Sequence, residues 1–163
     1  MSANSNISVT LDFYKEEYKS KLGDYHLSEE QSTYAPVPFE ALLKCEEDRT
    51  RYPIVILYNG VPAGFFVLHG WEGVKAYSTN KDAILLRGYS VNSMFQGKGI
   101  AKGSLIVLDS FVKREFPSKN EIILAANHKN KIAQHVYKSS GFVDKGVRVM
   151  GRKGELFILH KDL

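Results

Sequence analysis

The segment MFQGKGIAKG, residues 94–103, decides the prediction of the fold. It holds glycines and lysines but no acid, and it separates the apolar run Ala83–Val91 from the helical pattern of Gly103–Phe116. A glycine-rich turn between a strand and a helix is a general anion site, because N–H groups point outward and the helix dipole favours negative charge. We therefore examine which phosphate-binding pattern the turn matches.

Lys102 separates three phosphate-binding patterns that begin with these glycines. A P-loop that starts at Gly97 needs its second glycine at position 102, where the lysine stands. A dinucleotide loop built on Gly97 and Gly99 needs its third glycine at the same position. Both nucleotide patterns are therefore excluded. The third pattern, Q/R-x-x-G-x-G/A, is met in full by Gln96, Gly97, Lys98, Gly99, Ile100 and Ala101.

Strand and helix signals alternate along the rest of the chain. Asn59-Gly60 predicts a type I′ hairpin turn, and Ser28 with Gln31 forms a capping-box pattern. Strands are expected at Ile7–Leu11, Pro53–Tyr58, Pro62–Leu68, Ala83–Val91, Glu121–Asn127, Phe142–Met150 and Glu155–His160. Helices are expected at Phe13–Leu22, Pro38–Asp48, Gly103–Phe116 and from His128 to a stop at Gly141, whereas 71–82 reads as a loop. Strand–helix–strand units together with hairpins predict an α/β fold with a mixed sheet and helices on its faces.

A second motif follows the loop at a fitting distance. The spacing N-x-x-N-x-x-A-x-x-x-Y is met by Asn127, Asn130, Ala133 and Tyr137, and Gly141-Phe142 comes next. Val91 lies five residues before Gln96, at the end of the preceding strand. With these features the chain resembles the GNAT superfamily of N-acetyltransferases, closely from Ala83 to Phe142 and in outline elsewhere.

The resemblance implies a single acetyltransferase domain over residues 1–163 and acetyl-CoA as co-substrate. The sheet would be mixed and mostly antiparallel, with a parallel pair that splays at the cofactor site and helices on both faces. The last strands often form dimer contacts in this superfamily, so a homodimer is one expected assembly. The cofactor-binding residues implied are Tyr89, Ser90, Val91, Gln96, Gly97, Lys98, Gly99, Ile100, Ala101, Asn127, Asn130, Ala133 and Tyr137.

The resemblance also assigns roles within that set. The amides of Gln96–Ala101 hold the pyrophosphate, and the backbone of Tyr89–Val91 pairs with the pantetheine arm. The amide near Val91 faces the thioester carbonyl, and Ala133 leaves room for the pantetheine. Tyr137 is the catalytic residue that protonates the leaving thiolate. Residues 130, 133 and 137 share one helix face, whereas Ile132 and Val136 should pack on the sheet.

The chain departs from the family pattern at the general base. Many members carry a glutamate six residues before the Val91 position, where this chain has Leu85. Proton loss from the amine is therefore left to a water chain, a distant acid or solvent. Arg87 is the only charge in its strand, and we favour a structural pairing with an acid over a substrate contact. No Cys or Ser is placed for an acyl-enzyme, which favours direct attack in a ternary complex.

Charge is distributed unevenly along the chain. Basic residues dominate from Lys98 to Lys131, around the expected phosphates, whereas six acids and one lysine lie between Ser28 and Asp48. The acidic segment suits a cationic acceptor, although an ordinary solvated helix face explains it equally well. LRGYSVNSMFQGKGIAK is also similar to bacterial diamine and polyamine N-acetyltransferases. We therefore expect a small-molecule or peptide amine as acceptor, with a polyamine-like molecule favoured.

Composition bounds the remaining classes. The chain has 163 residues, a net charge of +4 and one cysteine, Cys45, whose acidic neighbours should raise its pKa and discourage nucleophilic chemistry. We expect a cytoplasmic protein with no signal peptide, no membrane association and no nucleic-acid partner. The five histidines lack metal-ligand spacing, so no metal is expected. A non-catalytic acyl-CoA-binding or sensing module is the alternative function, because the general base is unassigned.

Overall fold

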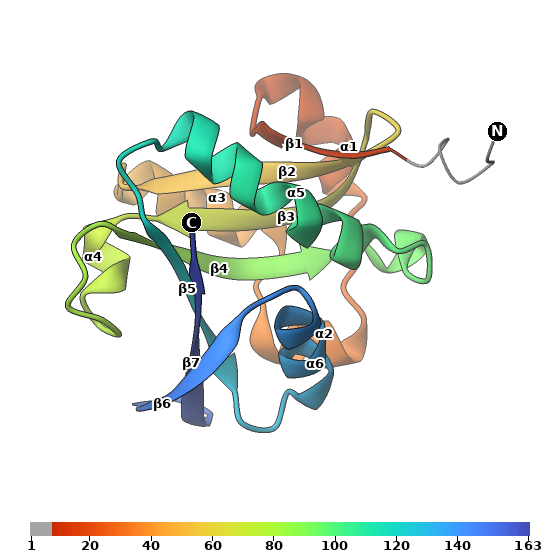
Figure 1. The fold of residues 1–163 in the computed structure, drawn as a ribbon. Helices are drawn as coiled ribbons and strands as arrows, with labels where there is room; N and C mark the ends of the chain where they lie inside the picture. The colour runs from red at the N-terminus through yellow and green to blue at the C-terminus, as the bar shows by residue number, and fades with distance from the viewer. Residues whose placement is uncertain (1–7) are drawn as a thin grey trace, which may run out of the picture.

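The computed structural model describes residues 8–163, and Ile7, the expected start of the first strand, lies outside them. The sheet has seven strands in the order β1-β2-β3-β4-β5-β7-β6 (Figure 1). The strands are β1 (Val9–Phe13), β2 (Arg51–Tyr58), β3 (Val61–His69), β4 (Ala83–Val91), β5 (Glu121–Asn127), β6 (Val143–Gly151) and β7 (Gly154–Asp162). Among these pairs β4–β5 is parallel and the others are antiparallel, which confirms the predicted mixed, mostly antiparallel sheet.

Helices cover both faces of the sheet, as predicted. They are α1 (Lys19–Gly23), α2 (Glu29–Tyr34), α3 (Pro38–Glu47), α4 (Trp71–Val74), α5 (Ile100–Glu115) and α6 (Lys131–Ser139), with short 3-10 turns at Glu16–Tyr18 and Ser93–Phe95. In Figure 1 α5 crosses in front of the sheet, whereas α1 and α3 lie behind it. The segment expected to be a loop after β3 contains the one-turn helix α4, because Gly73 and Val74 are buried there.

Alternation along the strands divides the core into two layers. Ile54 and Ile56 of β2 join the cluster under α5, and Val55 between them joins the cluster under α1 and α3. All three side chains are fully buried. Because successive strand residues point to opposite faces, one continuous apolar run fills both layers. The layers hold the ends of β4 and β5 at fixed positions beneath the helices.

The parallel pair separates halfway along its length. β4 and β5 are paired from Ala83↔Glu121 to Leu86↔Leu124, and no pairing follows beyond these residues. At that point β4 bulges against β3, and Gly88 adopts a φ of 64°. A bulge bends its strand and increases the local twist, which turns the end of β4 away from β5. α2 and α6 lie at the opening that results (Figure 1).

The loop between β4 and α5 and the helix after β5 lie at this opening, as the sequence motifs predict. The two expected hairpins are also present, and Asn59 and Gly60 both have positive φ, as a type I′ turn requires. One packing expectation is wrong. Val136 packs against the core, but Ile132 is 60% exposed, because α6 sits at the margin of the sheet and one flank of it faces the opening.

Candidate active site

A cleft of about 1680 Å³ fills the opening between β4 and β5. α2, α3, β4, the start of α5, β5, α6 and the β6–β7 turn contribute to its walls. The predicted site residues that line it are Tyr89, Val91, Gln96, Gly97, Gly99, Ile100, Ala101, Asn127, Asn130, Ala133 and Tyr137. Ser90 and Lys98 do not line it. The cleft thus brings together both sequence motifs, which are separated in the chain by most of α5 and by β5.

The glycine loop is open on the side that faces the cleft. Gly97 and Gly99 have φ values of 82° and 77°, and no other atom lies within 4 Å of a Cβ built on either residue. Positive φ strains side-chain-bearing residues, so glycine is needed for backbone conformation here. The turn delivers the chain to the first turn of α5, whose N–H groups lack intrahelical acceptors. An anionic group of pyrophosphate size therefore fits this corner electrostatically.

Tyr89 connects β4 to the start of α5. Its hydroxyl lies 3.2 Å from the carbonyl oxygen of Ala101, to which it donates, and it also contacts the hydroxyl of Ser104. Its ring stacks on Phe66 of β3 with 5.8 Å between centroids. Burial raises the pKa of Tyr89, so the phenol stays protonated and available as a donor. Tyr89 therefore fixes the position of the glycine loop relative to the strand.

Val91 ends β4 with its backbone directed into the opening. Its neighbours bond to β3 instead, since the N–H of Asn92 donates to the carbonyl oxygen of Ala63. The N–H and C=O of Val91 both bond to the side chain of Gln31 in α2, at 2.9 Å and 2.8 Å. Gln31 is a site residue that the sequence reasoning missed, because its pairing with Val91 spans 60 positions.

The side chain of Ser90 points the other way. Its hydroxyl lies 2.8 Å from the hydroxyl of Tyr25, and both side chains are buried in the layer beneath α1 and α3. Burial raises the pKa of Tyr25, so this phenol also stays protonated. Ser90 can therefore contribute to the cleft through its backbone position only.

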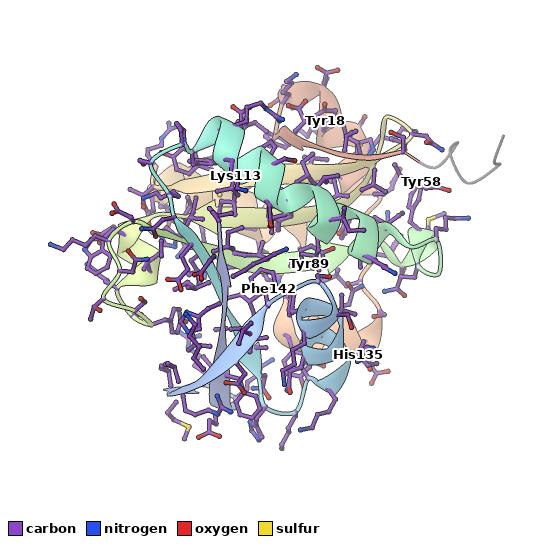
Figure 2. The ribbon with its side chains drawn as sticks, in the orientation of Figure 1. Tyr18, Tyr58, Tyr89, Lys113, His135 and Phe142 are labelled. Carbon is purple, nitrogen blue, oxygen red and sulfur yellow. The ribbon has the colours of Figure 1, made fainter. Side chains whose placement is uncertain are left out.

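Tyr137 projects from α6 into an aromatic group. Its ring contacts Tyr89 and Phe142 edge-on, with centroids 6.0 Å and 5.9 Å away. Figure 2 shows Tyr89 and Phe142 in the space between α5 and α6. Burial and, second, the neighbouring Tyr89 raise the pKa of Tyr137. The phenol is therefore protonated at neutral pH, as a proton donor must be.

The two asparagines of the second motif hold the backbone before α6. The side chain of Asn127 donates to the carbonyl oxygen of Lys153 at 3.0 Å and accepts from the N–H of Lys129 at 2.9 Å. Asn130 is the N-cap of α6 and accepts from the N–H of Ala133. The buried Gln134, which sequence reasoning did not single out, donates to the carbonyl oxygen of Asn127 at 2.8 Å. These contacts position Ala133 and Tyr137 on the cleft wall.

Charged and aromatic side chains of α2, α3, β4 and the segment that follows α4 also line the cleft. They are Glu30, Glu40, Lys44, Arg87 and Tyr77. Leu85, at the position of the family glutamate, is 2% exposed in the core and offers no base. Lys153 of the β6–β7 turn donates to the carbonyl oxygen of Thr33 in α2, which joins two walls across the cleft.

Among residues 8–163, Arg87 does not pair with an acid, contrary to expectation. Its guanidinium lies 3.1 Å from Nδ1 of His69, whose Nε2 lies 2.9 Å from the carboxylate of Asp48. Arginine only donates, so Nδ1 accepts and Nε2 donates to Asp48. Burial lowers the pKa of His69, which is consistent with this neutral ring. The acid, Asp48, therefore contacts Arg87 only through the imidazole of His69.

The remaining candidates for chemistry lie outside the cleft or are lacking. Cys45 is 7% exposed, and burial raises its pKa more than the neighbouring acids do. In the part of the chain that the structure describes, no three His, Cys, Asp or Glu side chains gather as metal ligands. Within residues 8–163 no helix has the length and apolar character needed to span a bilayer.

Comparison with known proteins identifies the class of the fold. The chain superposes on aminoglycoside acetyltransferase AAC(6')-Ib in complex with coenzyme A and kanamycin, with a TM-score of 0.75, 18% identity and coverage of 95% of both chains. It also superposes on a chimera of the spermidine N-acetyltransferase SpeG from Vibrio cholerae and hSSAT, with a TM-score of 0.65, 18% identity and coverage of 94% of both chains. The molecule thus has the fold of acetyltransferases.

Sequence similarity identifies the family. Residues 12–142 match the acetyltransferase (GNAT) family. An uncharacterised N-acetyltransferase of Bacillus subtilis (strain 168), YbbJ, is 42% identical over 153 residues, which cover 93% of this chain and 96% of the relative. The chain therefore belongs to the GNAT family and is an acetyl-CoA-dependent N-acetyltransferase.

Proposed function

We propose that this chain acts as a single domain, residues 1–163, which transfers the acetyl group of acetyl-CoA to a primary amine of a small molecule by direct attack in a ternary complex. The observation that carries the proposal is the separation of β4 and β5, with a glycine loop at one side of the opening and Tyr137 at the other. No metal enters this chemistry.

The residues present fit the proposed co-substrate. Gln96–Ala101 and the first turn of α5 offer N–H groups to the pyrophosphate, and Lys98 and Lys102 add positive charge beside it. The backbone of Tyr89–Val91 offers a strand edge to the pantetheine arm. Asn127 and Asn130 shape the opposite wall, where Ala133 leaves room next to Tyr137. When bound, acetyl-CoA supplies an activated acyl group.

The proposed reaction makes one bond and breaks one. The neutral amine nitrogen forms a bond with the thioester carbonyl carbon, and the carbon–sulfur bond breaks with its electron pair on sulfur. Tyr137 transfers its phenolic proton to that sulfur, and the amine nitrogen loses a proton to solvent. The N–H of Val91 stabilises the charge that develops on the carbonyl oxygen once Gln31 has left it. Tyr137 then regains a proton from solvent.

The acceptor is the finer part of the proposal. Glu30 and Glu40 line the cleft, which supports an acceptor that carries positive charge, such as a polyamine-like amine. The spermidine enzyme among the structural neighbours has this fold, but at 18% identity it does not define the acceptor. A peptide amine is the alternative acceptor, and the contact between Lys153 and Thr33 across the cleft favours a small molecule over a chain.

A homodimer remains part of the proposal. β6 is an edge strand, and its side chains Val143, Val147 and Met150 are exposed. Exposed edges of this kind pair readily with another chain. Sedimentation velocity of the purified protein distinguishes a dimer from a monomer.

The test of the proposed function is release of free thiol from acetyl-CoA in the presence of a panel of amines. We expect thiol release that depends on a primary amine and produces the N-acetylated amine in equal amount. Binding of acetyl-CoA without thiol release, for every amine, would instead indicate the acyl-CoA-binding or sensing module.

A further inference from the structure

Arg87 of β4 lines the cleft. Its strand position directs the side chain to the face that carries α3 and α4, because it pairs with Val67, which belongs to the cluster under α3. Glu40 and Lys44 of α3 and Tyr77 after α4 line the same cleft. Arg87 thus offers its guanidinium to the space where the acceptor must lie.

The guanidinium is half-buried and has unused donors. Its side chain makes a single hydrogen bond among residues 8–163, to Nδ1 of His69. No carboxylate of those residues lies within 4 Å of its nitrogens. A guanidinium carries five N–H groups in a fixed fork, so most of them have no partner in the described part of the chain.

The protein orients this guanidinium without neutralising it. His69 is 2% exposed and neutral, and it is held by the carboxylate of Asp48, which also accepts from Thr50 and pairs with Arg51. The charge of Asp48 therefore reaches Arg87 only through the imidazole. Removing a cation from water without a partner is unfavourable, and a ligand that pairs with it recovers part of that cost.

We propose that Arg87 binds a carboxylate of the acceptor, so that the substrate is an amino-acid-like primary amine instead of a plain polyamine. The proposal rests on the function proposed above and narrows its substrate class. A carboxylate matches the planar fork of an arginine through two parallel hydrogen bonds. Glu30 and Glu40 line the same cleft and suit the cationic part of such a zwitterion.

A singly charged carboxylate suits the surroundings of Arg87 better than a phosphate. α3 contributes one acid, Glu40, and one cation, Lys44, to the cleft that Arg87 lines. A zwitterion matches this mixture of charges, whereas a dianionic phosphate would meet Glu40. A plain polyamine, which carries protonated amines and no anionic acceptor, would leave the guanidinium of Arg87 without a charged partner.

The experiment compares amines that differ only by a carboxylate. Lysine and cadaverine, ornithine and putrescine, and phenylalanine and phenethylamine are assayed as three pairs, with kcat/KM of thiol release from acetyl-CoA as the readout. We expect the wild-type protein to prefer the carboxylated member of a pair by about 10- to 100-fold, the size of a charge-assisted pair. Arg87→Gln should bring the ratio close to one, and Arg87→Lys should give an intermediate ratio.

The control is Arg51→Gln. Arg51 also lies near Asp48 but does not line the cleft, so the preference should persist in this variant. Calorimetry measures the affinity of Arg87→Gln for acetyl-CoA, and we expect a value close to the wild type, which requires that the variant is folded. Equal rates for both members of each pair, or a preference that Arg87→Gln leaves intact, would overturn the assignment while the acetyltransferase function stands. Absence of thiol release with every amine would overturn the proposed function, and this inference with it.

Discussion

Gln31 and Val91 form a side-chain-to-backbone pair that resembles one step of a β-ladder. The Nε2 of Gln31 donates to the carbonyl oxygen of Val91 at 2.8 Å, and its Oε1 accepts from the Val91 N–H at 2.9 Å. Ser28 caps α2 by accepting from the N–H of Gln31. The helix start therefore holds an amide against the strand edge that we assign to the pantetheine arm.

This pair predicts competition between α2 and acetyl-CoA. Gln31→Ala removes the competitor, and two neutral hydrogen bonds contribute about 1 to 3 kcal/mol together, so the Kd for acetyl-CoA should fall roughly 5- to 150-fold. Isothermal titration calorimetry measures this. Glu29→Gln, at an exposed residue of α2 that does not line the cleft, serves as the control and should bind like the wild type. An unchanged or higher Kd for Gln31→Ala would mean that Gln31 does not compete with the co-substrate.

Replacement of Tyr137 by phenylalanine tests the proton donor. The variant keeps the edge contacts with Tyr89 and Phe142 but loses the hydroxyl, so kcat should fall at least about 100-fold, as loss of a general acid does, with little change in the Kd for acetyl-CoA. Because burial raises the pKa of Tyr137, the wild-type kcat should show no loss of this acid as the pH rises through neutrality. Unchanged turnover would remove Tyr137 from the reaction.

Tyr89→Phe gives a useful contrast with that variant. The hydroxyl of Tyr89 contacts Ala101 and Ser104 at the start of α5, so loss of this hydroxyl should weaken acetyl-CoA binding more than it slows turnover. Steady-state kinetics with calorimetry separates the two effects. The opposite ranking, with turnover more affected, would place the Tyr89 hydroxyl in the chemical step.

Gly99→Glu tests the glycine loop. Gly99 has a φ of 77° and faces open space at the start of α5, where a carboxylate would both strain the backbone and repel phosphate. Binding of acetyl-CoA should be lost in calorimetry. Gly146→Glu is the matched control, since Gly146 has a φ of 86° and equally open surroundings on β6, and it should bind normally. Retained binding in Gly99→Glu would refute the loop assignment.

Asp48 predicts a change of stability at acid pH. Hydrogen bonds from Thr50 and then from His69 lower its pKa from 3.8 to about 2. A group with a lowered pKa in the folded state stabilises the protein above its unfolded pKa and loses that contribution as the pH falls through the folded value. Asp48→Asn should therefore reduce the free energy of unfolding more at about pH 6 than at about pH 2.

Urea unfolding at the two pH values measures that difference. Asp24→Asn, at an exposed aspartate whose side chain makes no hydrogen bond or ion pair within residues 8–163, is the control and should give little difference at either pH. A destabilisation by Asp48→Asn that is independent of pH would show that shape and hydrogen bonding, instead of the carboxylate charge, matter at this position.

The sequence predicted the part of the site that is local. The strand before the loop and the strand after α5 have the bounds expected, and Gln96–Ala101 and Asn127–Tyr137 lie on one cleft because they follow those strands. Such segments carry their own signals in turn chemistry and apolar pattern. Gly88, a glycine inside a strand pattern, is a local signal for the bulge at which β4 leaves β5.

The contacts that complete the site are not local. Gln31 reaches Val91 across 60 positions, and Lys153 reaches Thr33 across 120. Neither pair has a motif, because any amide or ammonium in the right place can make such a bond. Arg87 illustrates the same limit, since a charge in a strand suggested an acid as partner and the fold supplied a histidine instead. Ile132 was misplaced because helix periodicity does not say where the sheet ends.

The initial-velocity pattern with acetyl-CoA and an amine varied together tests direct transfer most directly. If the amine attacks the thioester while both substrates are bound, double-reciprocal lines intersect and the protein incubated with acetyl-CoA alone keeps its unmodified mass. Parallel lines, together with a stable acetylated protein in the absence of amine, would contradict direct transfer in the cleft between β4 and β5.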